Sequence, residues 1–196
     1  MTERAVPSPT DPLASEQEAS LLAQGRAYYA QAQYQEALSC LHLAYDKLAS
    51  RPASDRDAQS QAAEIANDLG VVYTVLKRWQ EAVQWLDEAQ QRFANEGNLD
   101  GEAQTLGNLG SMYRARGDLR QAAACLQLSA DRFHLVGDNE RRAALLRALC
   151  VVRLCQLRPL QAVATYRDVL GCHPHPNWLV RLLRGLLGLP FRLQQR

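Results

Sequence analysis

The stretch LGNLGSMYRARGDLRQAAACLQLSA, residues 106–130, decides the fold because its pattern occurs four times along the chain. Its fixed positions are Leu109, Gly110, Tyr113, Ala122 and Leu126. Forty residues earlier the same offsets hold Leu69, Gly70, Tyr73, Ala82 and Leu86, and before that Gln24, Gly25, Tyr28, Ala37 and Leu41. A weaker downstream copy holds Leu149, Cys150, Arg153, Ala162 and Tyr166. Repetition with a period near 40 is typical of a helical solenoid.

Each fixed position has a physical role. Leu, Gly and Tyr at i, i+1 and i+4 share one helix, and the glycine lets a neighbouring backbone come close. The alanine follows nine residues after the tyrosine, past a short turn, on a second antiparallel helix. A methyl group fits where two helices cross tightly, and the large residue four positions later fills the next layer of that face. The pattern therefore predicts a helix crossing at Ala37, Ala82, Ala122 and Ala162.

The pattern resembles the tetratricopeptide repeat (TPR), a helix-turn-helix unit with the spacing W-x2-L-G-x2-Y…A-x3-F. The resemblance covers roughly residues 15–172, although the tryptophan position holds Leu21, Ala66, Leu106 and Leu146. The long period and the links EGN-x2-GEA and VGDNERRA make the repeats similar to those of kinesin light chains and G-protein-signalling modulators. The resemblance implies an all-α fold, a right-handed α-solenoid of four TPR units with a concave groove that grips extended or helical peptides.

The four repeats are expected over residues 15–50, 58–96, 99–136 and 139–172. Their helices are predicted at about 15–31, 34–50, 58–76, 79–95, 101–116, 119–135, 139–156 and 159–171. Ser15 and Glu18 match a capping box that would open the first helix. Residues 1–14 hold three prolines and are expected to be a disordered or extended arm. Five extra residues in the segment 50–57 are expected to form a loop between repeats.

Composition supports a helical protein with a continuous core. The 196 residues are 47% hydrophobic and only 7% aromatic, and the abundant Ala, Leu, Gln and Arg are good helix formers. The five cysteines lack metal-type spacing and are expected to be reduced, packed thiols. No apolar run is long enough for a transmembrane helix, and the N-terminus lacks the apolar core of a signal peptide. We therefore expect a cytoplasmic protein, with peripheral membrane contact as an open alternative.

The net charge of +1 conceals an uneven distribution. Residues 1–140 carry 12 basic and 20 acidic side chains, whereas residues 141–196 carry 10 arginines and one acid, Asp168. One end of the chain is therefore electropositive, which favours anionic partners.

The TPR resemblance also implies which side chains line the groove. They lie on the first helix of each repeat and are Leu22, Arg26, Tyr29, Glu64, Asn67, Val71, Thr74, Gln104, Ser111, Arg114, Arg147, Val151 and Leu154. The Asn and Lys set with which chaperone-binding TPRs clamp a C-terminal carboxylate is not reproduced. Arg26, Arg114 and Arg147 could still bind a carboxylate bidentately. A set of arginines that are merely solvated on a helix face is the open alternative.

The segment 177–196 is predicted to begin with a cationic amphipathic helix that ends before Pro190. One arc holds Arg181, Arg184, Gly185 and Gly188, and the rest of the circumference is almost entirely apolar. Three roles remain open: a cap on the solenoid, a contact with a partner or second copy, and an anionic membrane interface. The candidate contact residues are Trp178, Arg181, Leu182, Leu183, Arg184, Leu186 and Leu187.

No arrangement in the sequence predicts catalysis. There is no strand followed by a Gly-rich phosphate loop, and no Ser/His/Asp or paired-carboxylate set. Cys172-His173-Pro174-His175 is a dense group of potential ligands, but it lacks a recognised metal spacing and fits a turn after the last repeat helix. The basic tail lacks the interleaved aromatics of a nucleic-acid binder.

We therefore expect a non-catalytic adaptor without cofactor or metal. It would bind protein or peptide partners in its groove and support assembly of a protein complex. Two alternatives stay open: a peripheral membrane assembly factor anchored by residues 177–189, and a peptide-sensing regulatory module.

Overall fold

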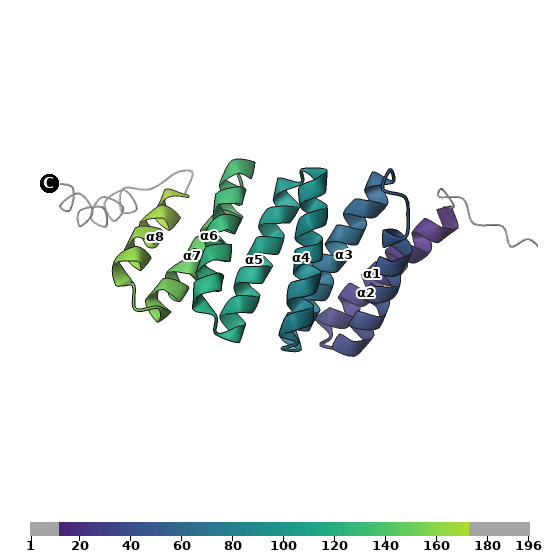
Figure 1. Cartoon of the computed structure of the whole chain (residues 1–196), viewed down its shortest axis with the longest axis horizontal. Helices are drawn as coiled ribbons and strands as arrows, with labels where there is room; N and C mark the ends of the chain where they lie inside the picture. The colour runs from purple at the N-terminus through teal and green to yellow at the C-terminus, as the bar shows by residue number, and fades with distance from the viewer. Residues whose placement is uncertain (1–11, 173–196) are drawn as a thin grey trace, which may run out of the picture. The chain divides into compact units, whose positions relative to one another are not determined.

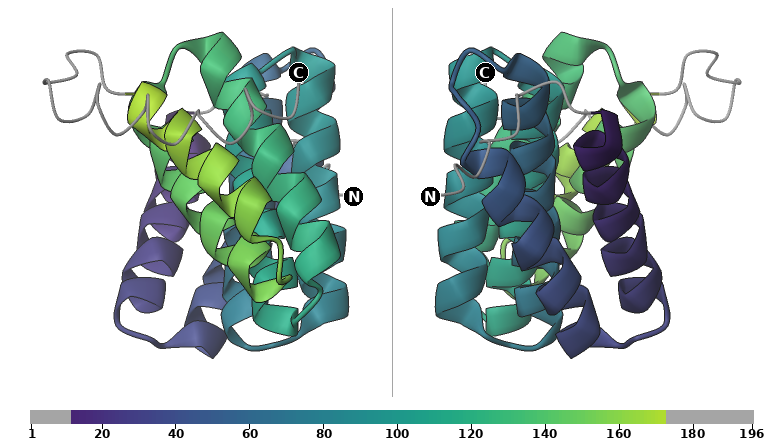
Figure 2. Two further views of the ribbon diagram at one scale, coloured as in Figure 1. Left: turned by 90° about the vertical axis from the view of Figure 1, so that its left-hand side faces the viewer. Right: turned by 90° about the vertical axis from the view of Figure 1, so that its right-hand side faces the viewer.

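The computed structural model describes residues 12–172, with side chains from residue 17 onward, and contains eight helices in that range (Figure 1). They are α1 (Pro12–Ala30), α2 (Tyr34–Ala49), α3 (Arg56–Val75), α4 (Trp79–Glu96), α5 (Leu99–Arg116), α6 (Leu119–Val136), α7 (Asn139–Cys155) and α8 (Pro159–Gly171). The contacts divide the chain into unit 1, with α1–α4, and unit 2, with α5–α8. Each repeat pairs a first helix, called A here, with a second, called B, as Figure 2 shows for α7 and α8.

The predicted all-α fold in helix pairs is confirmed, and the helix bounds differ only at some ends. Helix α1 begins at Pro12, so Ser15 lies inside it and is not its N-cap. Helix α5 begins at Leu99, before the predicted residue 101, because the Asn98 side chain accepts a hydrogen bond from the Gly101 N–H and caps the helix. The predicted helix over 177–189 and its contact residues lie outside the described part of the chain.

The signature alanines lie at the helix crossings, as predicted. Ala37, Ala82 and Ala122 are fully buried, and Ala162 is nearly so. The glycines allow the expected close approach of a neighbouring backbone: a Cβ at Gly70 would lie 3.3 Å from the Ala82 carbonyl oxygen, and one at Gly110 would lie 3.2 Å from the Leu126 nitrogen. The leucine side chains of the second helix come nearer still. A Cβ at Gly70 would lie 2.5 Å from Leu86 Cγ, and one at Gly110 would lie 2.7 Å from Leu126 Cγ. The large residue of the B helix therefore packs directly onto the glycine of the A helix.

The fourth repeat replaces this contact with a polar one. Cys150 stands at the glycine position, and its Sγ donates to the Ala162 carbonyl oxygen over 3.4 Å. Tyr166, at the position of the packed leucine, is 45% exposed. Arg153, at the tyrosine position, donates to Gln127 Oε1 at 3.0 Å and also bonds Thr165 Oγ1. The repeat that diverges in sequence is therefore joined to α6 and α8 by hydrogen bonds.

All four turns within the repeats have the same backbone geometry. One residue in each turn has a left-handed conformation: Ala32, Lys77, Gly117 and Leu157, with φ between 57° and 94°. The next N–H returns to the carbonyl at the tyrosine position, as from Arg78 to Tyr73 at 3.0 Å. This closes a Schellman-type helix end, where glycine is the favoured residue. Only the third repeat has glycine there.

Replacing Lys77 with glycine should therefore stabilise the chain. Lys77 is exposed and has a φ of 57°, so its side chain gains no burial that would offset the left-handed backbone. We expect a gain of roughly 0.5–1 kcal/mol, because the cost of about 1–2 kcal/mol for a left-handed L-residue is partly offset by glycine's greater freedom when unfolded. Urea denaturation measures the gain. Gly117→Ala at the equivalent turn should lower the urea midpoint, whereas Lys77→Gly should raise it. If both substitutions shift the midpoint in the same direction, the assigned turn geometry is wrong.

The segment between α2 and α3, which carries the five extra residues, is tied to the first repeat. Arg51 donates to Glu18 Oε2 at 2.6 Å and to Asp55 Oδ2 at 3.4 Å. Glu18 is only 6% exposed although it carries a carboxylate. Gln59 donates to the Arg51 carbonyl oxygen at 3.1 Å, and the Asp55 side chain caps α3. Sequence reasoning assigned Glu18 to a capping box, whereas it anchors this segment.

All five cysteines are free, but they are not uniformly packed. Cys172 is buried, whereas Cys155 is exposed. None of the helices within residues 12–172 combines the length and the apolar character needed to cross a bilayer.

Candidate binding surfaces

The predicted groove residues of α1 and α3 include an ion-paired cluster in unit 1. Arg26 donates from Nε to Asp68 Oδ2 at 2.7 Å and from Nη2 to Glu64 Oε2 at 3.3 Å. Arg26 and Glu64 side chains are each 51% exposed, and that of Asp68 is 27% exposed. The structure therefore brings Arg26 and Glu64 together, and the guanidinium predicted to bind a ligand carboxylate already binds two from its own chain.

The two carboxylates leave this cluster net acidic. Burial raises the pKa of Asp68, an effect that the hydrogen bond from Arg26 opposes and the nearby Glu64 charge reinforces. Burial opposes the charge on Arg26, but its bonds to Asp68 and Glu64 raise its pKa overall. A ligand that approaches α1 and α3 would thus meet a neutralised arginine and an exposed Glu64 carboxylate. This favours a basic or polar group over an acidic one.

The other predicted residues of unit 1 differ in accessibility. Tyr29 is 37% exposed, while Asn67 is 6% exposed and so lies deeper than its neighbours. Leu22, Val71 and Thr74 are half-buried. Thr74 donates its hydroxyl to the Gly70 carbonyl within α3 at 2.8 Å. Tyr29 and Glu64 are consequently the two most accessible of these side chains besides Arg26.

In unit 2 the predicted residues lie on α5 and α7, which are neighbours. A Cβ at Gly107 of α5 would lie 3.1 Å from Leu145 Cδ2 of α7, and Arg141 forms a salt bridge with Asp100. The predicted side chains Gln104, Ser111, Arg114, Arg147, Val151 and Leu154 are all exposed. Ser111 donates to the Gly107 carbonyl at 3.0 Å. We call these six side chains the α5–α7 surface.

The α5–α7 surface differs in charge from the corresponding side chains of unit 1. Arg114 and Arg147 are exposed, and neither forms a salt bridge with another residue in the described range. Val151 and Leu154 are each 52% exposed. Two accessible guanidinium groups on the same pair of helices as two exposed aliphatic side chains suit a ligand that offers both carboxylate and apolar groups.

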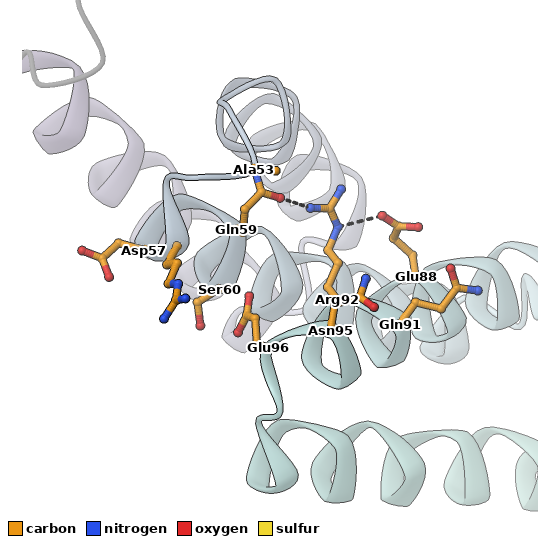
Figure 3. A pocket seen from close by; sticks show the side chains of 10 residues that line it. Ala53, Asp57, Gln59, Ser60, Glu88, Gln91, Arg92, Asn95 and Glu96 are labelled. Carbon is orange, nitrogen blue, oxygen red and sulfur yellow. Dashed lines mark hydrogen bonds and ion pairs between the residues drawn. The ribbon is translucent and has the colours of Figure 1, made fainter.

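A separate polar pocket of about 680 Å³ lies between the N-terminal part of α3 and the C-terminal part of α4 (Figure 3). Arg92 donates to Glu88 at 2.7 Å, to Gln59 at 2.6 Å and to the Tyr45 hydroxyl at 3.0 Å. Sequence reasoning did not find this pocket. Only the i, i+4 spacing of Glu88 and Arg92 was visible in the sequence, because Gln59 and Tyr45 lie on other helices, 33 and 47 residues away along the chain.

A half-buried histidine lies near this network in unit 1. His42 Nε2 is 2.8 Å from the Tyr73 hydroxyl, and its ring packs edge-on against Trp85 with the centroids 5.1 Å apart. Burial lowers the pKa of His42 from its ordinary value of 6.5; Asp46 opposes the shift and Arg78 adds to it. The neutral imidazole is therefore the form that the folded chain favours.

Unit 1 should consequently lose stability as the pH falls through about 6.5. Because the folded-state pKa of His42 is lowered, the unfolded chain binds more protons between the two pKa values, so stability falls as pH falls and levels off below the folded-state pKa. Thermal melts over a pH series test this. The variant His42→Gln keeps a hydrogen-bonding side chain without the titration, and its melting temperature should vary less in this window. Parallel curves would contradict the prediction.

The described residues offer no arrangement suited to metal chemistry. Within residues 12–172, no three His, Cys, Asp or Glu side chains gather in a way that could hold a metal ion.

Comparison with known proteins agrees with this geometry. The family model described as tetratricopeptide repeat matches residues 61–133. A search of the curated proteins found no match. Among solved structures, the chain is similar to the nearly identical TPR-like repeats of a Podosopora anserina protein assigned as a kinesin light chain. The two chains are 19% identical and have a TM-score of 0.61, and the alignment covers 90% of this chain and 88% of the other.

A second similar structure is BtubC (BKLC) from P. vanneervenii, with 14% identity and a TM-score of 0.61 over 91% of this chain and 84% of that one. At such identities the likeness concerns the fold. The helix pairs, the glycine–leucine contacts and the family match define a repeat protein of the helical class. Residues 61–133 of the chain match the tetratricopeptide repeat family, and its structural neighbours include kinesin light chain-like repeats.

Proposed function

We propose that this protein is a non-catalytic adaptor that binds a protein or peptide partner through the A helices and supports assembly of a protein complex. TPR domains generally bind protein partners. The observation that carries the proposal is the α5–α7 surface, where Arg114, Arg147, Val151 and Leu154 are exposed and Arg147 lies one helical turn before Val151 on α7. A partner segment with carboxylate and aliphatic side chains would complement it.

The two units would then make different contributions. In unit 1 the carboxylates of Glu64 and Asp68 neutralise Arg26, so this part of the chain would contact basic or polar groups. In unit 2 the exposed guanidinium groups of Arg114 and Arg147 would bind carboxylates through charge-assisted hydrogen bonds. Because the side chains are exposed, their substitution should alter binding with little effect on folding.

The test is affinity capture with the full chain and mass spectrometry, comparing wild type with the Arg114→Ala, Arg147→Ala double variant. Proteins that depend on the α5–α7 surface should be captured by the wild type and lost with the double variant. Arg56→Ala is the matched control, because Arg56 is also exposed and without a salt bridge in the described range, but lies on α3. If the double variant captures the same proteins as wild type, the proposed surface is not the binding site.

A further inference from the structure

The two intra-repeat turns of unit 2 lie next to each other at one end of that unit (Figure 1). Gln156, in the α7–α8 turn, donates from Nε2 to the Leu119 carbonyl at the start of α6, over 2.7 Å. Residues on these turns therefore form one continuous surface. We call the side chains of Leu154, Leu157, Leu160, Arg116, Arg120 and Arg158 the turn-end surface.

The leucines of this surface are exposed at positions where the other repeats are mostly polar or small. Leu157 is 88% exposed, and its counterparts are Ala32, Lys77 and Gly117. Leu160 is 56% exposed, and its counterparts are Gln35, Gln80 and Arg120. The first three repeats thus fold without leucine at either position, so packing of the repeat does not require it.

Leu157 also occupies a backbone conformation that disfavours it. Its φ is 59°, in the left-handed region where glycine is preferred, and its side chain gains almost no burial in return. Pro159 follows at the start of α8 and restricts the backbone of this turn. A strained, exposed leucine on a restricted turn is explained if its side chain inserts into an apolar environment outside the chain.

The arginines around these leucines are uncompensated. Arg116, Arg120 and Arg158 are exposed, and the part of the chain that the structure describes gives none of them a salt bridge. The nearest acid in sequence is Asp118, whose Oδ1 accepts a hydrogen bond from the Gln121 N–H as the cap of α6, and this single carboxylate is outnumbered by the three arginines. The leucines are therefore framed by net positive charge.

We propose that the turn-end surface binds an anionic phospholipid bilayer, with Leu157 and Leu160 entering the interface and the three arginines contacting lipid headgroups. Protruding apolar side chains with a basic surround match the charge and polarity of such an interface. A bilayer accepts leucines on an exposed turn without a complementary pocket, which an acidic protein would have to supply. This function goes beyond partner binding, and it uses side chains outside the α5–α7 surface except for Leu154, which belongs to both.

The experiment is co-sedimentation of the full chain with phosphatidylcholine–phosphatidylserine vesicles, beside neutral phosphatidylcholine vesicles of the same size. Wild type should partition onto the anionic vesicles and dissociate as salt is raised. The partition coefficient of the variant Leu157→Gln, Leu160→Gln on anionic vesicles should be lower by about tenfold or more. The variant Arg116→Gln, Arg120→Gln, Arg158→Gln should lose on the order of a hundredfold at low salt, because each basic residue contributes roughly fivefold.

The matched control is Leu128→Gln, Leu135→Gln, which removes two exposed leucines from α6, 53% and 69% exposed. This control should partition like wild type, and far-ultraviolet circular dichroism should show that all variants are folded. The proposal is overturned if wild type does not bind anionic vesicles. It is equally overturned if the Leu157, Leu160 variant binds as wild type does, since the contact then lies elsewhere, or if the α6 control loses as much.

Discussion

Replacing Leu86 with alanine should lower the free energy of unfolding by about 2–5 kcal/mol, the range for a fully buried leucine that leaves a cavity. Leu86 is completely buried and packs onto Gly70, where an added Cβ would lie 2.5 Å from its Cγ. Urea denaturation monitored by circular dichroism measures the change. Tyr166→Ala is the matched control at the equivalent position of the fourth repeat, and it should cost clearly less because Tyr166 is 45% exposed.

The contact between Leu86 and Gly70 also predicts that the effect of Gly70→Ala on stability changes sign when Leu86 is replaced. In the wild type, Gly70→Ala should destabilise, because overpacking costs roughly 1–3 kcal/mol and exceeds the helix-propensity gain of about 1 kcal/mol. In the Leu86→Ala background the obstructing side chain is gone, and the same substitution should become neutral or stabilising. A double-mutant cycle therefore isolates the contact. If Gly70→Ala has the same effect in both backgrounds, the two residues are not packed as described.

Replacing Arg51 with methionine should cost about 3–5 kcal/mol, the typical penalty for leaving a buried charge without its partner. The Glu18 carboxylate is 6% exposed and lies 2.6 Å from Arg51 Nη2. Loss of the guanidinium would leave that carboxylate buried and unpaired, and would free the segment between α2 and α3 from α1. The midpoint of urea denaturation of the full chain measures the loss.

Two further variants separate the buried pair from the weaker contact beside it. The double variant Arg51→Met, Glu18→Met should regain much of the lost stability, because apolar residues replace a buried ion pair at little cost. Asp55→Asn removes the 3.4 Å ion pair but keeps a side-chain oxygen able to cap α3, so its effect should be small. If Asp55→Asn is as damaging as Arg51→Met, the Glu18 pair is not the anchor.

The sequence by itself predicted the fold, and it placed the helix bounds to within about three residues. The repeated alanines and glycines predicted the crossings that the structure has, with Ala82 and Ala122 fully buried. This succeeded because those contacts occur within one helix hairpin, where an offset along the chain specifies which residues meet. Four near-copies also reveal which positions matter. The starts of α3 and α5 were placed two residues late, because the capping roles of Asp55 and Asn98 were not recognised, although Asn98 is the counterpart of Asp138, which caps α7.

Only the tertiary structure decided how charged and polar side chains on different helices pair. Glu18 binds Arg51, Arg26 binds Glu64 and Asp68, and Arg153 bonds across to Gln127. These partners are 26 to 42 residues apart in sequence. Long side chains can reach several neighbours, so their partners depend on how neighbouring helices are placed and not on spacing within one. The turn-end surface could not be predicted from the sequence either. Leu157 and Leu160 are apolar residues that could equally have been buried, and only the folded turn leaves them exposed.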